Sequence, residues 1–357
     1  MLMVVYIHGY NLDQRYLQPW TTPQEPLTLT SFTEYFFSNG IFRFVIPMLF
    51  CISGYLYAIR DDQPYTQRTK KRLRVLFVPY LIWSAAGFLL VYILEMFPYT
   101  RMLVANSHLV WISNTRLLLH DYHWYEILAR WVLIPVPYQL WFIVVLTVYN
   151  IAYPALRWCV LHPIIRWIYF TVVIFLWLTT FGTVLVEGEG LLFFSLGILM
   201  QKINFNIETA PRLLNPFAWG IAFIVLCAGK TWLAFKGFAF MGNAVFPLLS
   251  LIHKLAIMCG LIAAWYGSSR LAGWCMRYKW FVWLSGFSFI VYVVHAPAVA
   301  IAIDGAFAWM HYMYGYRILT YIFLPAVIIM ASIAFGVLLR WLSPRLYSIA
   351  TGGRGLG

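Results

Sequence analysis

The stretch that decides the fold runs from residue 43 to residue 57 and reads Arg43-Phe44-Val45-Ile46-Pro47-Met48-Leu49-Phe50-Cys51-Ile52-Ser53-Gly54-Tyr55-Leu56-Tyr57. It is apolar along nearly all of its length, as a membrane-spanning helix is, but it contains an arginine and a Ser-Gly pair. An arginine inside a bilayer costs roughly 2.5 to 3.5 kcal/mol on insertion scales and normally faces a polar cavity or a partner. The alternative is an arginine whose guanidinium snorkels to the interface. The stretch therefore favours a membrane helix that lines a polar, functional interior.

Composition extends this interpretation to the whole chain. Of the 357 residues, 62% are hydrophobic and only 10% are charged, whereas soluble domains average about 25% charged residues. A helix needs about 20 apolar residues to cross a hydrocarbon core about 30 Å thick, and such runs recur. We expect an all-α fold: a polytopic membrane helix bundle of about ten transmembrane helices, forming one integral membrane domain over residues 1–357. Complete spans are predicted at 36–57, 75–97, 131–153, 164–181, 190–202, 213–229, 244–265, 280–303 and 318–341.

The first helix is predicted to be incomplete. Residues 1–10 precede the polar segment 11–34, and ten helical residues cover only about 15 Å. The helix is either truncated at its start or re-entrant and supported by surrounding protein, and we prefer truncation. No basic start or small-residue cleavage site marks it as a signal peptide.

Lysines and arginines predict the orientation, because cytoplasmic loops carry an excess of both. If the chain enters from the cytoplasm, the basic segment 60–74 and most other basic residues fall in inner loops. We therefore expect cytoplasmic termini. The net charge of +13 then indicates a membrane protein and no nucleic-acid partner. The basic residues left on the outer side are Arg15, Arg101, Arg116, Arg130, Lys230, Lys236 and Arg317.

Metal, disulfide and nucleotide-binding patterns are missing from the sequence. The five cysteines have no CxxC spacing, and no Walker-type or G-x-G-x-x-G loop occurs. The long outer loop 98–126 contains a group that could be imagined to bind a metal. Histidines in a Tyr/Trp-rich loop are usually interfacial, so we expect no metal site. The group consists of His108, His120, Asp121 and His123.

Ionisable groups within the spans gather toward one side of the predicted bundle. Arg43 lies about 12 Å below the outer boundary at 1.5 Å per residue, a level that His8 can share. Ordinary alternatives exist: His295 could bind a helix carbonyl, and Glu95 could lie at the headgroups. Together the groups predict a polar cavity open to the outside. Lys254 is placed near mid-span, and Glu95, Glu187, His295 and Asp304 toward the outer ends.

Several segments resemble the acyltransferase-3 family in their order and spacing. Early in the chain these are Val4-Val5-Tyr6-Ile7-His8, the 46–56 part of the opening stretch, and Lys71-Arg72-Leu73-Arg74 leading to Pro79-Tyr80-Leu81-Ile82-Trp83-Ser84. Later, Gln139-Leu140-Trp141-Phe142 resembles the family's "LWF" helix and segment 193–199 its "FxxGxxL" helix. Segment 287–295, Phe-Ser-Phe-Ile-Val-Tyr-Val-Val-His, resembles its "S-x-x-I/V-Y-x-x-H" helix. The resemblance covers nearly the whole chain.

The resemblance implies a multi-pass enzyme of the bacterial cytoplasmic (inner) membrane. Such an enzyme moves an acyl group, usually acetyl, from acyl-coenzyme A to a hydroxyl of an envelope carbohydrate such as an exopolysaccharide or a lipid-linked sugar. His8 matches the histidine taken as the family's catalytic base. An arginine that the family commonly carries about ten residues earlier has no counterpart here, because the chain begins seven residues before His8.

The residues fit this chemistry. A positioned imidazole, here that of His8, can accept the proton of a sugar hydroxyl that attacks a thioester. The resulting oxyanion needs a fixed donor, for which Arg43 is one candidate and Ser53 a weaker one. Basic side chains could bind the phosphates of the coenzyme, although the positive-inside bias alone would produce the same cluster. These side chains are Arg68, Lys71, Arg72 and Arg74.

The expected partners are acyl-coenzyme A as co-substrate, a carbohydrate acceptor and membrane lipids, with no tightly bound cofactor and an open oligomeric state. Substrate-binding candidates are Glu95, Trp141, Lys254 and His295. The alternative function is a polytopic transporter or flippase for a sugar or lipid-linked sugar. Spans broken near the midplane would be its sign, and Gly242, Pro247 and Lys254 could be interpreted in that way.

Overall fold

A computed structural model of the protein describes residues 1–13, 16–107, 109–110 and 118–355. Within these ranges the regular structure is helical, apart from one isolated β-bridge between Gly182 and Glu187. The chain divides into two compact units, one formed by residues 1–9, 65–148 and 280–357 and the other by residues 10–64 and 149–279. The all-α expectation is confirmed. One domain over the whole chain remains a prediction.

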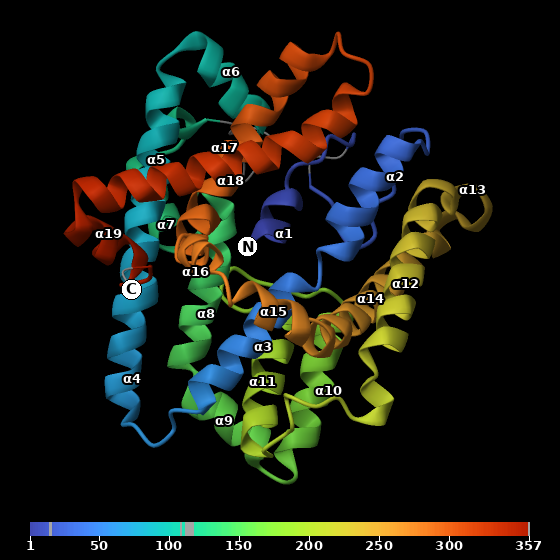
Figure 1. Ribbon diagram of the computed structural model, residues 1–357, viewed down its shortest axis with the longest axis vertical. Helices are drawn as coiled ribbons and strands as arrows, with labels where there is room; N and C mark the ends of the chain where they lie inside the picture. Colours follow the sequence, from blue (N-terminus) through green and yellow to red (C-terminus); the bar gives the residue numbers. More distant parts are fainter. Residues whose placement is uncertain (14–15, 108, 111–117, 356–357) are drawn as a thin grey trace. The chain divides into compact units, whose positions relative to one another are not determined.

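The first unit contains the start of the chain and its C-terminal helices (Figure 1). Helices α17 and α18 pack against each other, and the short α1 contacts both of them. Val5 of α1 is fully buried against Val291, Val299 and Ile328. The elements are α1 (Leu2–Tyr6), α4 (Tyr65–Arg72), η2 (Leu73–Phe77), α5 (Val78–Glu95), α6 (Pro98–Ser107), η3 (Leu119–Asp121), α7 (Trp124–Leu133), η4 (Tyr138–Leu140), α8 (Trp141–Ile151), α16 (Lys279–Ser285), α17 (Ser288–Met310), α18 (Tyr316–Leu342) and α19 (Pro344–Thr351), with the last turn of α8 and the first residue of α16 falling in the other unit.

The second unit is built from two closely packed helix pairs, α3 with α11 and α12 with α14 (Figure 1). A core around Phe44, Phe223 and Cys227 joins the start of α3 to α12 and α14. The elements are α2 (Leu29–Phe36), η1 (Phe37–Ile41), α3 (Val45–Ala58), α9 (Tyr153–Leu161), α10 (Ile165–Leu178), α11 (Gly188–Lys202), η5 (Arg212–Leu214), α12 (Pro216–Lys236), α13 (Phe238–Met241), η6 (Gly242–Ala244), α14 (Val245–Gly267) and α15 (Ser269–Cys275).

The Ser-Gly pair of the opening stretch has a packing role in this unit. A Cβ atom at Gly54 would collide with the carbonyl oxygen of Phe194, and one at Gly197 would collide with that of Cys51. Helices α3 and α11 therefore approach each other backbone to backbone. Small residues permit such close approach between membrane helices, where packing replaces the hydrophobic effect.

Most predicted spans coincide with helices, but 131–153 and 280–303 each cross a break between helices, and the expected total of ten is not confirmed. In the described ranges, six helical segments are long and apolar enough to cross a membrane, and up to eight if two bent helix pairs each count as one span. Helix α11, at 15 residues, covers only about 22 Å and is too short to be included. The two bent pairs are α7 with η4 and α8, and α9 with α10.

Two of the basic residues predicted on the outer side are buried within helices. Lys230 lies within α12 and is fully buried, and Arg130 lies within α7 and is 4% exposed. The count of charges could not reveal the burial of Lys230 and Arg130, because each lies within a largely apolar helix. Arg15 and Arg116 of the same group lie outside the described residues.

The segment after α3 is anchored by a carboxylate. Asp61 accepts hydrogen bonds from Tyr153 (2.7 Å) and Arg157 (2.8 Å) of α9, and its carboxylate lies 2.5 Å from Nζ of Lys202 on α11. Partial burial alone would raise the pKa of Asp61, but these three partners hold it below its ordinary value. The carboxylate thus fastens this loop to two helices of its own unit.

Candidate active site

His8 lies just beyond α1, in the first unit, and its ring is half-buried. Its Nδ1 is 2.9 Å from the hydroxyl of Tyr138 on η4, and the two rings meet edge to face with centroids 5.2 Å apart. The next residue, Gly9, lies so close to α18 that a Cβ there would be 2.7 Å from the ring of Pro325. The chain around His8 is therefore held from two sides.

A second histidine shares this site. The ring centroid of His295, on α17, is 5.5 Å from that of His8, and His295 is fully buried. Its Nδ1 is 2.8 Å from the carbonyl oxygen of Tyr292. A carbonyl only accepts, so Nδ1 carries the proton and Nε2 is left as an acceptor. Among the described residues, nothing donates to that Nε2.

The segments that carry these residues are tied together directly. Nε2 of Gln139 donates to the carbonyl of Val293 at 2.9 Å, and the Tyr292 hydroxyl donates to the carbonyl of Gln139. Three segments that resemble the acyltransferase-3 motifs, those around His8, Gln139 and His295, thus meet within one unit. Tyr138 was missed at the sequence level, although it directly precedes the Gln139-Leu140-Trp141-Phe142 segment. Trp141 itself is half-buried at the start of α8.

Arg43 lies in the other unit, on the turn between η1 and α3. Its Nη2 donates to the carbonyl of Leu17 at 2.7 Å and its Nε to that of Ser38 at 3.0 Å. These two bonds hold the loop before α2 against the turn between η1 and α3. Arg43 therefore has a structural role. A role of Arg43, or of the half-buried Ser53 on α3, as oxyanion donor remains a prediction.

The second unit also holds buried basic groups on α12 and α14. Nζ of Lys230 donates to the carbonyl of Asn39 at 2.6 Å and lies 2.9 Å from Nδ1 of His253. The predicted substrate-binding residue Lys254 is 4% exposed, and its Nζ is 3.5 Å from the carboxylate of Glu189. Sequence spacing could not show these contacts, because the partners lie far apart in the chain.

The remaining substrate-binding candidate, Glu95, anchors a loop. Its carboxylate accepts from the backbone N–H of Leu119 at 2.7 Å and lies 2.5 Å from Nδ1 of His120. Among the residues that the structure describes, no three His, Cys, Asp or Glu side chains are grouped so that they could hold a metal ion. His108, of the group considered at the sequence level, lies outside the described residues.

The predicted coenzyme-binding residues lie on α4 and η2 of the first unit. Lys71 and Arg74 are exposed, Arg72 is half-buried and Arg68 is buried. Arg354 lies near Arg72, a proximity that sequence reasoning missed, and it donates to the carbonyls of Val75 (3.2 Å) and Thr351 (2.8 Å). Burial, and then the charge of Arg72, lower the pKa of Arg354. Positive charge is thus concentrated where η2 meets the C-terminal segment.

Comparison with known proteins identifies the class of this chain. A family model described as "Acyltransferase domain" matches residues 1–341. The chain is also similar to the succinoglycan biosynthesis protein ExoH of Rhizobium meliloti (strain 1021), with 26% identity over 330 residues, which are 89% of this chain and 81% of that protein. No solved structure gives a significant match. The chain belongs to the acyltransferase-3 family and is a multi-pass membrane acyltransferase.

Proposed function

We propose that this protein transfers an acyl group, in the first instance acetyl, from acyl-coenzyme A to a hydroxyl of an envelope polysaccharide or of its lipid-linked precursor. The similarity to a succinoglycan biosynthesis protein supports a polysaccharide acceptor. The observation that carries the chemistry is the contact between His8 and Tyr138, at 2.9 Å, beside His295.

In the proposed mechanism the Tyr138 hydroxyl accepts a hydrogen bond from Nδ1–H of His8, which leaves Nε2 as the base. The oxygen of the acceptor hydroxyl attacks the thioester carbonyl and forms the new C–O bond. As it attacks, Nε2 of His8 takes the proton of that hydroxyl. Collapse of the tetrahedral intermediate breaks the C–S bond, and the thiolate leaves with the proton returned by His8. A substrate-binding role for His295 stays a prediction, because its Nε2 is buried in the structure.

The donor side of the proposal rests on the basic side chains of α4 and η2. Replacement of Arg72 and Arg74 by Gln is expected to raise the KM for the acyl donor more than it lowers kcat, because phosphate contacts stabilise ground state and transition state alike. Arg270→Gln, at an exposed position of the second unit, is the matched control. An unchanged KM would leave positive-inside bias as the reason for the cluster. We also propose the bacterial inner membrane as the location, with cytoplasmic termini.

Thioester turnover tests the function. Protein in lipid nanodiscs is mixed with acetyl-coenzyme A and with alkali-deacylated polysaccharide from the source cell. Free thiol should appear only when both are present, and the polysaccharide should gain acetyl esters. If no thiol is released but the protein moves the sugar across a liposome membrane, the protein is a carrier and the proposal is wrong.

A further inference from the structure

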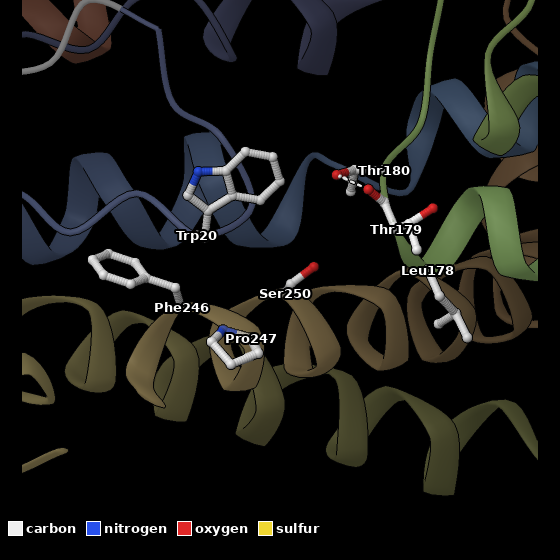
Figure 2. Close-up of a pocket in the computed structure, with 7 residues that line it drawn as sticks. All are labelled: Trp20, Leu178, Thr179, Thr180, Phe246, Pro247 and Ser250. Atoms are coloured by element: carbon white, nitrogen blue, oxygen red, sulfur yellow. Dashed lines mark hydrogen bonds between the residues drawn. The ribbon is translucent and has the colours of Figure 1, made fainter. Parts of the chain in front are cut away.

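A pocket of about 470 Å³ lies in the second unit, at the end of α10 and the start of α14 (Figure 2). The loop before α2 contributes Trp20, and α14 contributes Phe246, Pro247 and Ser250. The remaining wall is the end of α10 and the two residues after it, 178–180. Ligand pockets of proteins usually fall between about 300 and 1,000 Å³, so the size suits a small molecule or one sugar unit of a longer chain.

The lining combines aromatic faces with hydroxyl groups and contains no charged side chain. In Figure 2 the indole of Trp20 and the hydroxyl of Ser250 both border the open space. Within the described part of the chain, neither the indole N–H nor the Ser250 hydroxyl has a hydrogen-bond partner. The Thr179 and Thr180 hydroxyls donate to backbone carbonyls, which leaves their oxygens as acceptors.

This chemistry selects a neutral polyhydroxylated ligand. A pyranose ring has apolar C–H faces that can lie on an aromatic side chain, and hydroxyls at its edge that both donate and accept. The indole suits such a ligand because it offers an apolar body with one polar N–H. A phosphate-bearing donor would need basic partners, and the lining has none.

The wall that carries Trp20 is held in place. Three side chains of the α2–α3 segment donate to backbone carbonyls of its loop: Tyr35 to Thr21 at 2.8 Å, Asn39 to Gln18 at 2.9 Å and Arg43 to Leu17 at 2.7 Å. A site held before binding loses less entropy when the ligand arrives. This gives Arg43 a positioning role for the loop of Trp20.

The wall at the end of α10 and the wall on α14 are also held together by side-chain contacts. Glu189 of α11 accepts from Nε1 of Trp177 at 3.1 Å and pairs with Nζ of Lys254 at 3.5 Å. That ammonium also lies 5.2 Å from the ring centroid of Trp177. Trp177 directly precedes residues 178–180 of the wall, and Lys254 lies one helical turn after Ser250 on α14. The predicted substrate residue Lys254 thus acts on the pocket by positioning its walls.

We propose that this pocket binds a neutral sugar ring stacked on Trp20, with Ser250 and the threonine oxygens binding its hydroxyls. As a site for the acceptor, the pocket rests on the proposed function. Sugar binding itself does not, because it needs no acyl donor. The sugar could arrive on a soluble oligosaccharide or on a lipid, and the experiment separates these sources.

Binding is measured by titration calorimetry in phosphatidylcholine nanodiscs without acyl donor. The probes are oligosaccharides from the alkali-deacylated polysaccharide in one arm, dodecyl maltoside in a second and dodecylphosphocholine in a third. Trp20→Ala should weaken sugar binding at least tenfold, and Ser250→Ala should weaken it less. Trp167→Ala, an equally apolar change at a 72% exposed position of α10, should leave it unchanged.

Trp20-dependent binding of the oligosaccharides supports a soluble source, and Trp20-dependent binding of dodecyl maltoside alone supports a lipid-linked one. The proposal is overturned if no sugar probe binds, if Trp20→Ala leaves sugar binding unchanged, or if dodecylphosphocholine binds equally well in a Trp20-dependent manner. Sugar binding without any acyl transfer would refute the proposed function and leave the pocket standing. If Trp20→Ala protein transfers acyl groups with the same KM for the acceptor as wild type, the pocket is not the acceptor site, and the proposed function is unaffected.

Discussion

At the scale of single residues, the proton on the ring of His8 determines what this side chain can do. A tyrosine hydroxyl can donate or accept, so the 2.9 Å contact with Tyr138 allows either tautomer. Only the one with the proton on Nδ1 leaves Nε2 basic. His295 differs, because the carbonyls of its own helix fix its tautomer and its ring is fully buried. His8 is only half-buried, which favours it over His295 as the proposed base.

Tyr138→Phe tests this positioning role. Loss of one hydrogen bond worth about 0.5–1.5 kcal/mol should lower kcat by roughly two- to tenfold, with both KM values and the melting temperature close to wild type. Steady-state kinetics and thermal unfolding in nanodiscs measure these quantities. Tyr314→Phe, at a fully exposed position of the same unit, is the control. If kcat is unchanged, Tyr138 does not orient His8.

At the scale of elements, close helix packing explains the glycines of the opening stretch and of the segment that resembles the family's "FxxGxxL" helix. Gly54→Ala should destabilise the protein by about 1–3 kcal/mol, because the methyl group forces α3 and α11 apart. Gly229→Ala is the control, since an added Cβ there meets nothing within 4 Å and alanine favours the helix. The melting temperature of each variant is measured, and that of Gly54→Ala should be the lower one. Equal values would mean that the two helices do not touch at Gly54.

The loop after α3 gives a pH-dependent prediction. The pKa of Asp61 is lowered in the folded protein, so its ion pairs add stability above the unfolded value of about 3.9, and this stability is lost as the pH falls through the folded value. Asp61→Asn should therefore lower the melting temperature at pH 7, and the deficit should shrink as the pH drops below about 4. Asp62→Asn changes the exposed neighbouring carboxylate and should have little effect. If Asp61→Asn lowers the melting temperature equally at pH 7 and below about pH 4, the ion pairs of Asp61 are not the cause.

At the scale of the whole molecule, periodicity and composition predicted the helices well and the polar interior poorly. Apolar runs revealed the spans because bilayer thickness imposes their length, and His8 was found through its motif. The burial of Lys230 could not be predicted, because its partners, Asn39 and His253, are distant in sequence and only folding joins them. The contact of Tyr138 with His8 is likewise long-range. The sequence showed Arg43 as an unusual charge but could not show that it fastens a loop.

The orientation in the membrane is a separate whole-molecule prediction. A cysteine placed at Lys71 should not react with an impermeant maleimide in intact cells and should react after permeabilisation, because the basic segment is expected in the cytoplasm. A cysteine at Tyr125, in the predicted outer loop and 56% exposed, should react in intact cells. The reverse pattern would invert the topology and remove the basis for coenzyme binding at Arg72 and Arg74.

The measurement that tests the central claim most directly is single-turnover acyl transfer by His8→Ala protein in nanodiscs, with polysaccharide acetylation as the readout. Loss of the general base should slow transfer by at least about 10²-fold, while donor binding and melting temperature stay near wild type. His311→Ala, which removes an exposed histidine of the same unit, should transfer normally. A His8→Ala protein that folds normally and still transfers acyl groups at more than about a tenth of the wild-type rate would contradict the assignment of His8 as the base.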